Sequence, residues 1–271
     1  MKVRQVILAA LTVAGMTSLS PAVAMADTTG APVTAQHGSL VALGDSISYG
    51  YNLGPNNLQP STEAFPYLLA KLNQDTVQNL AVPGWTSGDL LAALQNNSSF
   101  QSAVKSAKVV TVDIGSNDLL GLASTDGLLT SLNPSLTAQQ QSQFAAAIAQ
   151  FAKNLPDIIN RVHSLNPSAY IVLYNLYDPF DATLLPGLHN LAEKLIGQEN
   201  EIISQTAATS HLTVADAYQA FNGRQAVFVR PLDVHPTVYG QDALATVGEA
   251  ALASEEVQSF KTYLQSFHLW W

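Results

Sequence analysis

Five apolar runs rich in β-branched residues recur along the chain, and stretches with helical spacing separate them. The runs are residues 39–43, 76–80, 109–114, 170–174 and 212–215. The helical stretches are residues 63–72, 88–94, 137–165 and 188–208, and a last one that begins near residue 238. Strands that alternate with helices in this way form a parallel sheet with helices on both faces. The pattern predicts an α/β protein, a three-layer α/β/α sandwich with a five-stranded parallel sheet. Pro156 is expected to kink or divide the helix over 137–165.

The first residues are typical of a secretory signal peptide. Lys2 and Arg4 precede the apolar stretch 6–16, and Ala24-Met25-Ala26 supplies small residues for cleavage. The apolar stretch is shorter than the roughly 20 residues that span a bilayer, which favours a cleaved signal over a membrane anchor. We therefore expect a signal peptide over 1–26 and a secreted mature chain without a stable membrane span. No repeat or long Pro/Gly/Ser linker interrupts residues 27–271, which predicts a single domain.

Composition excludes several classes of function. Loss of Lys2 and Arg4 with the signal peptide leaves 9 basic residues against 20 acidic ones, a net charge of −11. A protein that binds the nucleic-acid backbone is not expected from this balance. The chain has no cysteine, so it has no disulfides, thiolate nucleophiles or Cys-based metal sites. Charged residues make up 11% of the chain, against about 25% in ordinary soluble domains. One hypothesis is that such a surface suits an acidic medium. The sequence leaves the oligomeric state open.

Three short motifs stand at the ends of apolar runs, and a fourth precedes the last helix. They are Gly44-Asp45-Ser46, Val82-Pro83-Gly84, Gly115-Ser116-Asn117 and Asp233-Val234-His235. Each alone also fits an ordinary turn or a helix cap. Because ligands of parallel α/β sheets sit outside the carboxyl ends of the strands, the first three motifs are expected to meet there. Together they supply a serine nucleophile, a histidine base and neutral oxyanion donors in Gly84 and Asn117.

Six histidines compete for the role of base. His235 alone has a carboxylate two residues earlier and a proline directly after it. His189 and Glu193 are four residues apart on one expected helix and are able to share a metal ion. No further ligand follows them, so a solvated pair is favoured and no metal site is predicted.

These motifs identify the chain as similar to the GDSL-type SGNH hydrolase superfamily. The resemblance extends over nearly all of residues 39–250 and includes the strings at 41–50 and 113–120, Asn166-Pro167, and Tyr177-Asp178-Pro179-Phe180. It implies a flavodoxin-like sandwich that cleaves ester or thioester bonds without a metal or cofactor. The family's serine, glycine, asparagine and histidine fall on Ser46, Gly84, Asn117 and His235.

The resemblance has one departure, in the acid of the triad. In many relatives the acid stands three residues before the histidine, where this chain has Leu232, and Asp233 stands only two before. Asp233 is expected to reach the imidazole all the same, with a backbone carbonyl as the alternative. Asp216, after the fifth run, is a further candidate.

The resulting prediction is a secreted serine esterase or lipase that acts on a small-molecule or lipid ester through an acyl-serine. Segments 50–62 and 119–134 are expected to wall an acyl pocket, unless they are plain surface connections. Alternatives within the superfamily are a carbohydrate acetylesterase and a thioesterase or lysophospholipase. Alternatives from other classes are a non-catalytic binding module and an interaction protein that uses the aromatic residues of 267–271.

Overall fold

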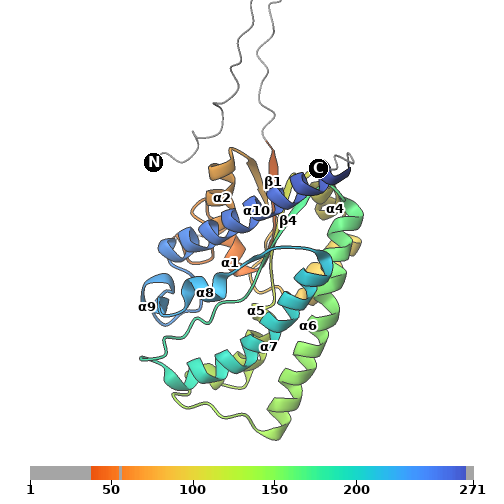
Figure 1. The fold of residues 1–271 in the computed structure, drawn as a ribbon. Helices are drawn as coiled ribbons and strands as arrows, with labels where there is room; N and C mark the ends of the chain where they lie inside the picture. The colour runs from red at the N-terminus through yellow and green to blue at the C-terminus, as the bar shows by residue number, and fades with distance from the viewer. Residues whose placement is uncertain (1–37, 55–56, 267–271) are drawn as a thin grey trace, which may run out of the picture. The chain divides into compact units, whose positions relative to one another are not determined.

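Five parallel strands form the centre of the fold in this computed structural model, which describes residues 38–54 and 57–266 (Figure 1). The strands are β1 (Ser39–Gly44), β2 (Thr76–Asn79), β3 (Val109–Asp113), β4 (Tyr170–Tyr174) and β5 (Val214–Ala215). Their order is β2-β1-β3-β4-β5, and every neighbouring pair is parallel. This is the flavodoxin-like order, so the predicted fold class is confirmed. The expected signal peptide over 1–26 and the aromatic residues of 267–271 lie outside the described residues.

Helices cover both faces of the sheet. One face packs against α3 (Ser87–Asn96), α4 (Ser98–Ser106), α6 (Ala138–Leu165) and α7 (Pro186–Ser210). The other face packs against α2 (Phe65–Asn73), α8 (Ala217–Phe221) and α10 (Val238–Ser266). Figure 1 shows α2 and α10 on one side of the strands and α6 and α7 on the other. The shorter elements are α1 (Ser46–Tyr49), α5 (Ser116–Thr125), the 3-10 helix η1 (Leu128–Thr130) and α9 (Gln225–Phe228).

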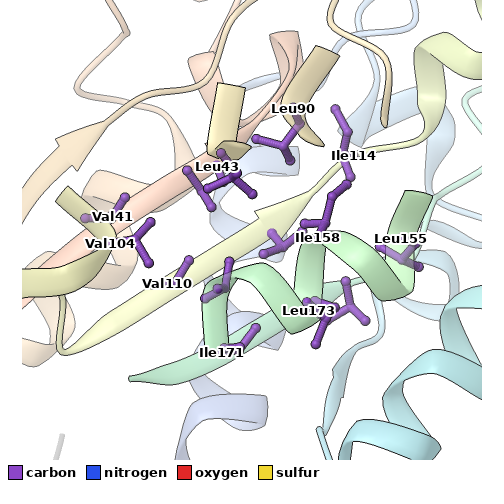
Figure 2. Packing of buried hydrophobic residues seen from close by; sticks show 14 of the residues in the cluster. Val41, Leu43, Leu90, Val104, Val110, Ile114, Leu155, Ile158, Ile171 and Leu173 are labelled. Carbon is purple, nitrogen blue, oxygen red and sulfur yellow. The ribbon is translucent and has the colours of Figure 1, made fainter. Parts of the chain in front are cut away.

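Alternation along β1 divides its side chains between the two cores. Val41 and Leu43 pack against the α3 and α6 side, where Figure 2 shows them in the same cluster as Ile158. Leu40 and Ala42 pack against the α2 and α10 side. Because successive side chains of a strand point to opposite faces, a strand between two helical layers must be apolar throughout. That requirement explains why the strands stood out in the sequence as continuous apolar runs.

The long helix α6 was expected to kink or divide at Pro156, and it is not divided. A proline inside a helix removes one backbone hydrogen bond. On the same helix Phe151, Leu155 and Ile158 are fully buried against the sheet. A capping box formed by Thr137 and Gln140 also secures the start of the helix. Packing and capping outweigh the single lost bond, so α6 is one helix.

The sequence analysis missed the short helices α1, α8 and α9 and also two longer helical segments. Residues 119–134 were expected to be a loop, but most of them belong to α5 and η1. Helix α4 was not predicted because six of its nine residues are serine, glutamine or lysine, although Asn97 in front of it is a recognisable cap. Helices α4 and α5 gain their stability from tertiary contacts rather than from propensity.

In the described part of the chain, no helix is both long enough and apolar enough to cross a membrane.

Candidate active site

Ser46 lies directly beyond the carboxyl end of β1, as the first residue of α1. The chain leaves the strand through Gly44, where a Cβ atom would stand 2.5 Å from the Asp113 carbonyl oxygen of β3. Only glycine permits this close approach. Asp45 then caps α1, because its Oδ1 accepts a hydrogen bond of 2.9 Å from the Ile47 amide. The turn and its cap therefore fix the position of Ser46 beyond the carboxyl end of β1.

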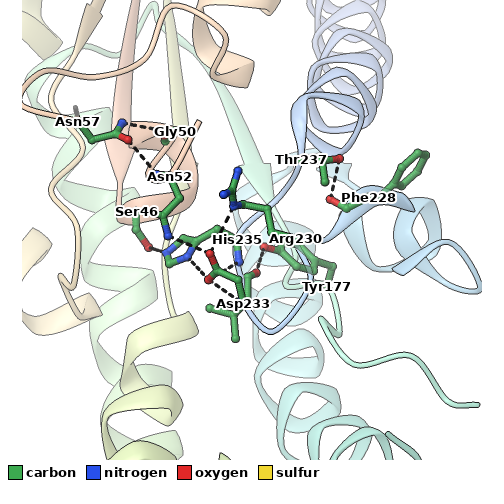
Figure 3. Close-up of polar contacts among 11 residues, drawn as sticks. Ser46, Gly50, Asn52, Asn57, Tyr177, Phe228, Arg230, Asp233, His235 and Thr237 are labelled. Atoms are coloured by element: carbon green, nitrogen blue, oxygen red, sulfur yellow. Dashed lines mark hydrogen bonds and ion pairs between the residues drawn. The ribbon is translucent and has the colours of Figure 1, made fainter. Parts of the chain in front are cut away.

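A line of hydrogen-bonding atoms joins Ser46, His235 and Asp233 (Figure 3). His235 Nε2 lies 2.9 Å from Ser46 Oγ, and its Nδ1 lies 2.5 Å from Asp233 Oδ1. All three side chains are partly buried, so solvent still reaches the hydroxyl. This order of hydroxyl, imidazole and carboxylate is that of a serine hydrolase triad. The structure therefore places Asp233, not a backbone carbonyl, beside the imidazole.

The loop that carries His235 explains the unusual spacing of the acid. Leu232, at the position where many relatives have the acid, has a φ of 58° and a fully exposed side chain. Asp233 instead accepts a hydrogen bond of 2.7 Å from the Val234 amide. The Arg230 amide donates to the His235 carbonyl oxygen at 3.0 Å and closes the loop. Because the loop turns this tightly, a carboxylate two residues before the histidine reaches its Nδ1.

The segment 50–62, expected to wall an acyl pocket, supports the triad instead. Asn52 Nδ2 donates to Asp233 Oδ2 at 2.8 Å, and the Tyr51 ring lies 5.1 Å from the His235 ring. Burial acts to raise the pKa of Asp233, but the hydrogen bonds from Asn52 and His235 outweigh it and lower the pKa below its usual value. Asp233 is thus held as a carboxylate. Asn52 has a φ of 65°, a conformation that asparagine tolerates better than most residues, but the sequence analysis did not single it out.

Two backbone amides and one side-chain amide are the candidate oxyanion donors. Among the described residues, the amides of Ser46 and Gly84 have no hydrogen-bond acceptor. Gly84 has a φ of 85°, and a Cβ there would meet no atom within 4 Å. The glycine is therefore required by the turn and not by lack of space. Asn117 Nδ2 donates to the Trp85 carbonyl oxygen at 3.0 Å and to Asp45 Oδ2 at 3.2 Å. An oxyanion can take the place of the longer of these two acceptors.

Buried carboxyl groups lie behind the serine. Burial, reinforced by the charge of Asp113, raises the pKa of Asp45 well above its usual value. Burial likewise raises the pKa of Asp113 to about 6, although a hydrogen bond from Ser48 opposes the shift. The raised pKa makes the Asp45 carboxyl group a weaker acceptor for the Asn117 amide than a fully ionised carboxylate is.

The remaining sequence candidates lie elsewhere. Asp216 caps α8, where it accepts from the Gln219 amide at 3.0 Å, and it makes no contact with His235. Tyr177 was noted only as part of a family-like string. Its hydroxyl donates to the Val234 carbonyl oxygen at 2.7 Å and so anchors the histidine loop. Its structural role was not apparent from the sequence, because the two residues are 57 positions apart.

An apolar pocket opens beside Ser46. It is partly open to solvent and is lined almost entirely by apolar side chains. Leu119 and Leu128 line it from the segment predicted to wall an acyl pocket, and Leu188 and Ala192 line it from α7. Phe144 of α6 and Phe180 complete the apolar wall. The leucines of 119–134 thus both bound the pocket and join a small buried cluster.

The flavodoxin-like fold and the arrangement of Ser46, His235 and Asp233 define a hydrolase of the serine type. The chain belongs to the GDSL-like Lipase/Acylhydrolase family, whose sequence pattern it matches over residues 42–243. It is therefore an ester-hydrolysing enzyme of the serine hydrolase type.

Individual relatives agree with this assignment. The spore germination lipase LipC of Bacillus licheniformis is 26% identical over 222 residues, which cover 78% of this chain and 94% of that protein. The structure of the lipase Lip_vut3 from a goat rumen metagenome has a TM-score of 0.62 and 24% identity, over 79% of this chain and 96% of that one. Phospholipase A1 from Streptomyces albidoflavus NA297 has a TM-score of 0.61 and 23% identity, over 79% and 99%. The two structures share the fold of this chain.

Proposed function

We propose that this chain is an exported carboxylesterase or lipase that cleaves esters of apolar acyl groups through an acyl intermediate on Ser46. The observation that carries the proposal is the hydrogen-bonded line from Ser46 Oγ through His235 to Asp233, located at the mouth of an apolar pocket. A nucleophile, its base and a space for the acyl group therefore lie together.

The proposed reaction has two halves. His235 Nε2 takes the proton of Ser46 Oγ as the oxygen attacks the ester carbonyl, and the same imidazole then protonates the departing alcohol. Water attacks the acyl-serine with His235 again as base, which releases the acid and restores the serine. Asp233 stays ionised and holds the imidazole with Nδ1 protonated.

The oxyanion of each tetrahedral intermediate is assigned to three donors. The Ser46 and Gly84 amides are available to it, and Asn117 contributes one hydrogen of its side-chain amide. All three are neutral, so they add no proton that is lost near neutral pH. The raised pKa of the buried Asp45 carboxyl group favours its neutral form beside the developing oxyanion.

The substrate class follows from the pocket. Its lining is mostly leucine, alanine, isoleucine and phenylalanine, and burial of a methylene group contributes about 0.8 kcal/mol. A medium-length acyl chain therefore gains more from this pocket than an acetyl group does. The names of the lipase and phospholipase relatives are in keeping with such a substrate. Export is proposed from the sequence of residues 1–26.

Covalent labelling tests the nucleophile. Incubation with a fluorophosphonate probe should attach one probe molecule per chain, and mass spectrometry of the peptides should locate it on Ser46. The variant Ser46→Ala should remain unlabelled, whereas Ser99→Ala, which changes an exposed serine of α4, should label like the wild type. A probe on another residue would refute the assignment.

A substrate panel tests the acyl pocket. Aryl esters from acetyl to palmitoyl should give the highest kcat/KM at medium chain length. The variant Ala192→Phe, which fills part of the pocket, should lower the ratio of decanoyl to acetyl turnover by about tenfold, the equivalent of burying two fewer methylene groups. Acetylated polysaccharide or an acyl thioester as the best substrate would instead favour the carbohydrate acetylesterase or the thioesterase.

A further inference from the structure

A second cluster of ligand-type side chains joins the segment after β4 to the first turns of α7. It consists of Asp178, His189 and Glu193, whose ligand atoms all lie within 4.8 Å of one another. His189 Nδ1 lies 2.5 Å from Asp178 Oδ2. In the part of the chain that the structure describes, no other three ligand-type residues come this close. The sequence analysis found the pair on α7 but not Asp178, which stands before the helix and not after it.

Within the described residues, the two carboxylates of the cluster have no lysine or arginine partner. Among these same residues, His189 is the only ion-pair partner of Asp178. The Tyr218 hydroxyl donates to Glu193 Oε2 at 2.5 Å. Two carboxylates that share one imidazole make a local excess of negative charge, which attracts a cation.

We propose that Asp178, His189 and Glu193 bind a divalent transition-metal ion of the Zn²⁺ type. One imidazole nitrogen and two carboxylate oxygens are a donor set that Zn²⁺ accepts. The ion replaces the proton between His189 Nδ1 and Asp178 Oδ2, and that proton leaves to solvent. Bonds of about 2.0–2.1 Å in tetrahedral geometry require the two atoms to move from 2.5 Å to about 3.3 Å apart. Water completes the coordination, since the His189 side chain is partly exposed.

Such an ion would act on the acyl pocket rather than on the ester bond. Pro179 and Phe180, which follow Asp178, line the pocket on one side. Leu188 and Ala192, which adjoin His189 and Glu193, line it from α7. A metal ion held by both segments ties the two walls together. The expected consequence is a more stable protein with a more rigid pocket.

Binding of Zn²⁺ to the full chain tests the proposal. Isothermal titration at pH 7 should show one site per chain, and Zn²⁺ at 100 times its Kd should raise the Tm by about 5 to 10 °C. The variants His189→Ala and Glu193→Gln should each weaken binding by at least tenfold. The matched control His163→Ala, which changes a histidine of α6 outside the cluster, should bind like the wild type.

Two further measurements establish where the ion binds and which kind of ion the cluster prefers. The variant His235→Ala should bind Zn²⁺ as the wild type does, which distinguishes the cluster from the imidazole beside Ser46 whether or not the proposed catalysis is correct. Ca²⁺ should bind at least tenfold more weakly than Zn²⁺. The proposal is overturned if the wild type binds no Zn²⁺, if Glu193→Gln binds it with unchanged affinity while folded by circular dichroism, or if Ca²⁺ binds as tightly.

Discussion

The protein contains two aspartate–histidine pairs with the same geometry and different surroundings. In each, an imidazole Nδ1 lies 2.5 Å from a carboxylate oxygen. The Asp233 side chain is 20% exposed, whereas that of Asp178 is 2% exposed. The pKa of Asp233 is lowered, because hydrogen bonds from Asn52 and His235 outweigh the effect of burial. The pKa of Asp178 is raised to about 6, because there burial outweighs the hydrogen bonds.

The third group at each imidazole decides what the pair can do. His235 Nε2 faces the Ser46 hydroxyl at 2.9 Å, which makes it a base for a nucleophile. His189 has Glu193 close by instead of a hydroxyl, which makes the pair part of a candidate metal site. An aspartate–histidine pair is therefore not a catalytic signature on its own. The comparison also shows that deeper burial shifts the pKa of a carboxyl group upward, even when a histidine lies at the same distance.

Removal of the His235 imidazole should have the largest effect on activity. We expect His235→Ala to lower kcat/KM for an aryl ester by about 10⁴-fold or more, because no base remains for Ser46. The control His163→Ala, on α6 and outside the proposed site, should keep wild-type kinetics. Steady-state assays with a medium-chain nitrophenyl ester measure both. Retention of substantial activity in His235→Ala would mean that the wrong pair has been assigned to catalysis.

The role of the unusually spaced acid can be measured next. Asp233→Asn should lower kcat by about 10³ to 10⁴-fold, because the amide favours the wrong imidazole tautomer, with little change in KM. The size of the loss distinguishes Asp233 from a backbone carbonyl as the group that orients His235. A loss of less than tenfold would show that another group holds the ring.

Oxyanion donors are proposed for the Asp233–His235 pair, which acts on Ser46, and not for the Asp178–His189 pair. Asn117→Ala should lower kcat by about 10² to 10³-fold, because one of three proposed donors is lost. Asn96→Ala, an exposed change on α3, is the matched control. If Asn117→Ala changed KM and left kcat intact, the amide would contribute to binding of the substrate rather than to the transition state.

The hydrogen bond from Asn52 should have a smaller effect, and one that depends on pH. Asn52→Ala should lower kcat by about tenfold and should raise the pKa of Asp233, because the carboxylate loses a donor. Asp233 is charged only at pH values above its pKa in the folded protein. Because this pKa is higher in the variant, the variant should lose activity at a higher pH than the wild type as the pH falls. Profiles of kcat between pH 4 and 8, compared with those of Asn96→Ala, test this. Identical acid limbs would contradict it.

Burial as the cause of a raised carboxyl pKa can be tested at Glu199, away from both pairs. This side chain of α7 is fully buried, and neither of its oxygens has a hydrogen-bond partner within the described residues. Burial first, and then the charge of Asp118, raises the pKa of Glu199 to about 9. The folded state therefore favours the protonated form, and stability falls as the pH rises from about 4.5 toward 9.

The variant Glu199→Gln should remove that pH dependence. Its gain in unfolding free energy over the wild type should grow with pH by at most about 1.4 kcal/mol per unit. Urea denaturation at pH 5 and pH 8 measures the difference, and Glu201→Gln on the exposed face of α7 is the control. If the variant exceeds the wild type in unfolding free energy by the same amount at pH 5 and pH 8, Glu199 is already ionised at pH 5. A stability that falls as the pH rises is also in keeping with the hypothesis that the protein suits an acidic medium.

Much of the fold followed from the pattern of the sequence. The strand β4 was predicted with both of its ends, and β1, β2 and β3 to within one residue, because a parallel sheet covered on both faces needs continuous apolar runs. Helix α4 was missed because its composition is polar. Pro156 does not divide α6, because a local rule takes no account of the buried face of that helix. Local propensity is weaker than tertiary packing in both cases.

By itself, the sequence determined which residue types stand after the strands, since Ser46, Gly84 and Asn117 each follow an apolar run whose direction the parallel sheet dictates. Only the tertiary structure decided that Asp233 reaches His235, that Asn52 holds Asp233, and that Asp178 joins His189. These contacts depend on how loops turn and on residues up to 181 positions apart. Periodicity along a chain carries no information about such distances, because it reports the face on which a residue lies and not the residue across from it.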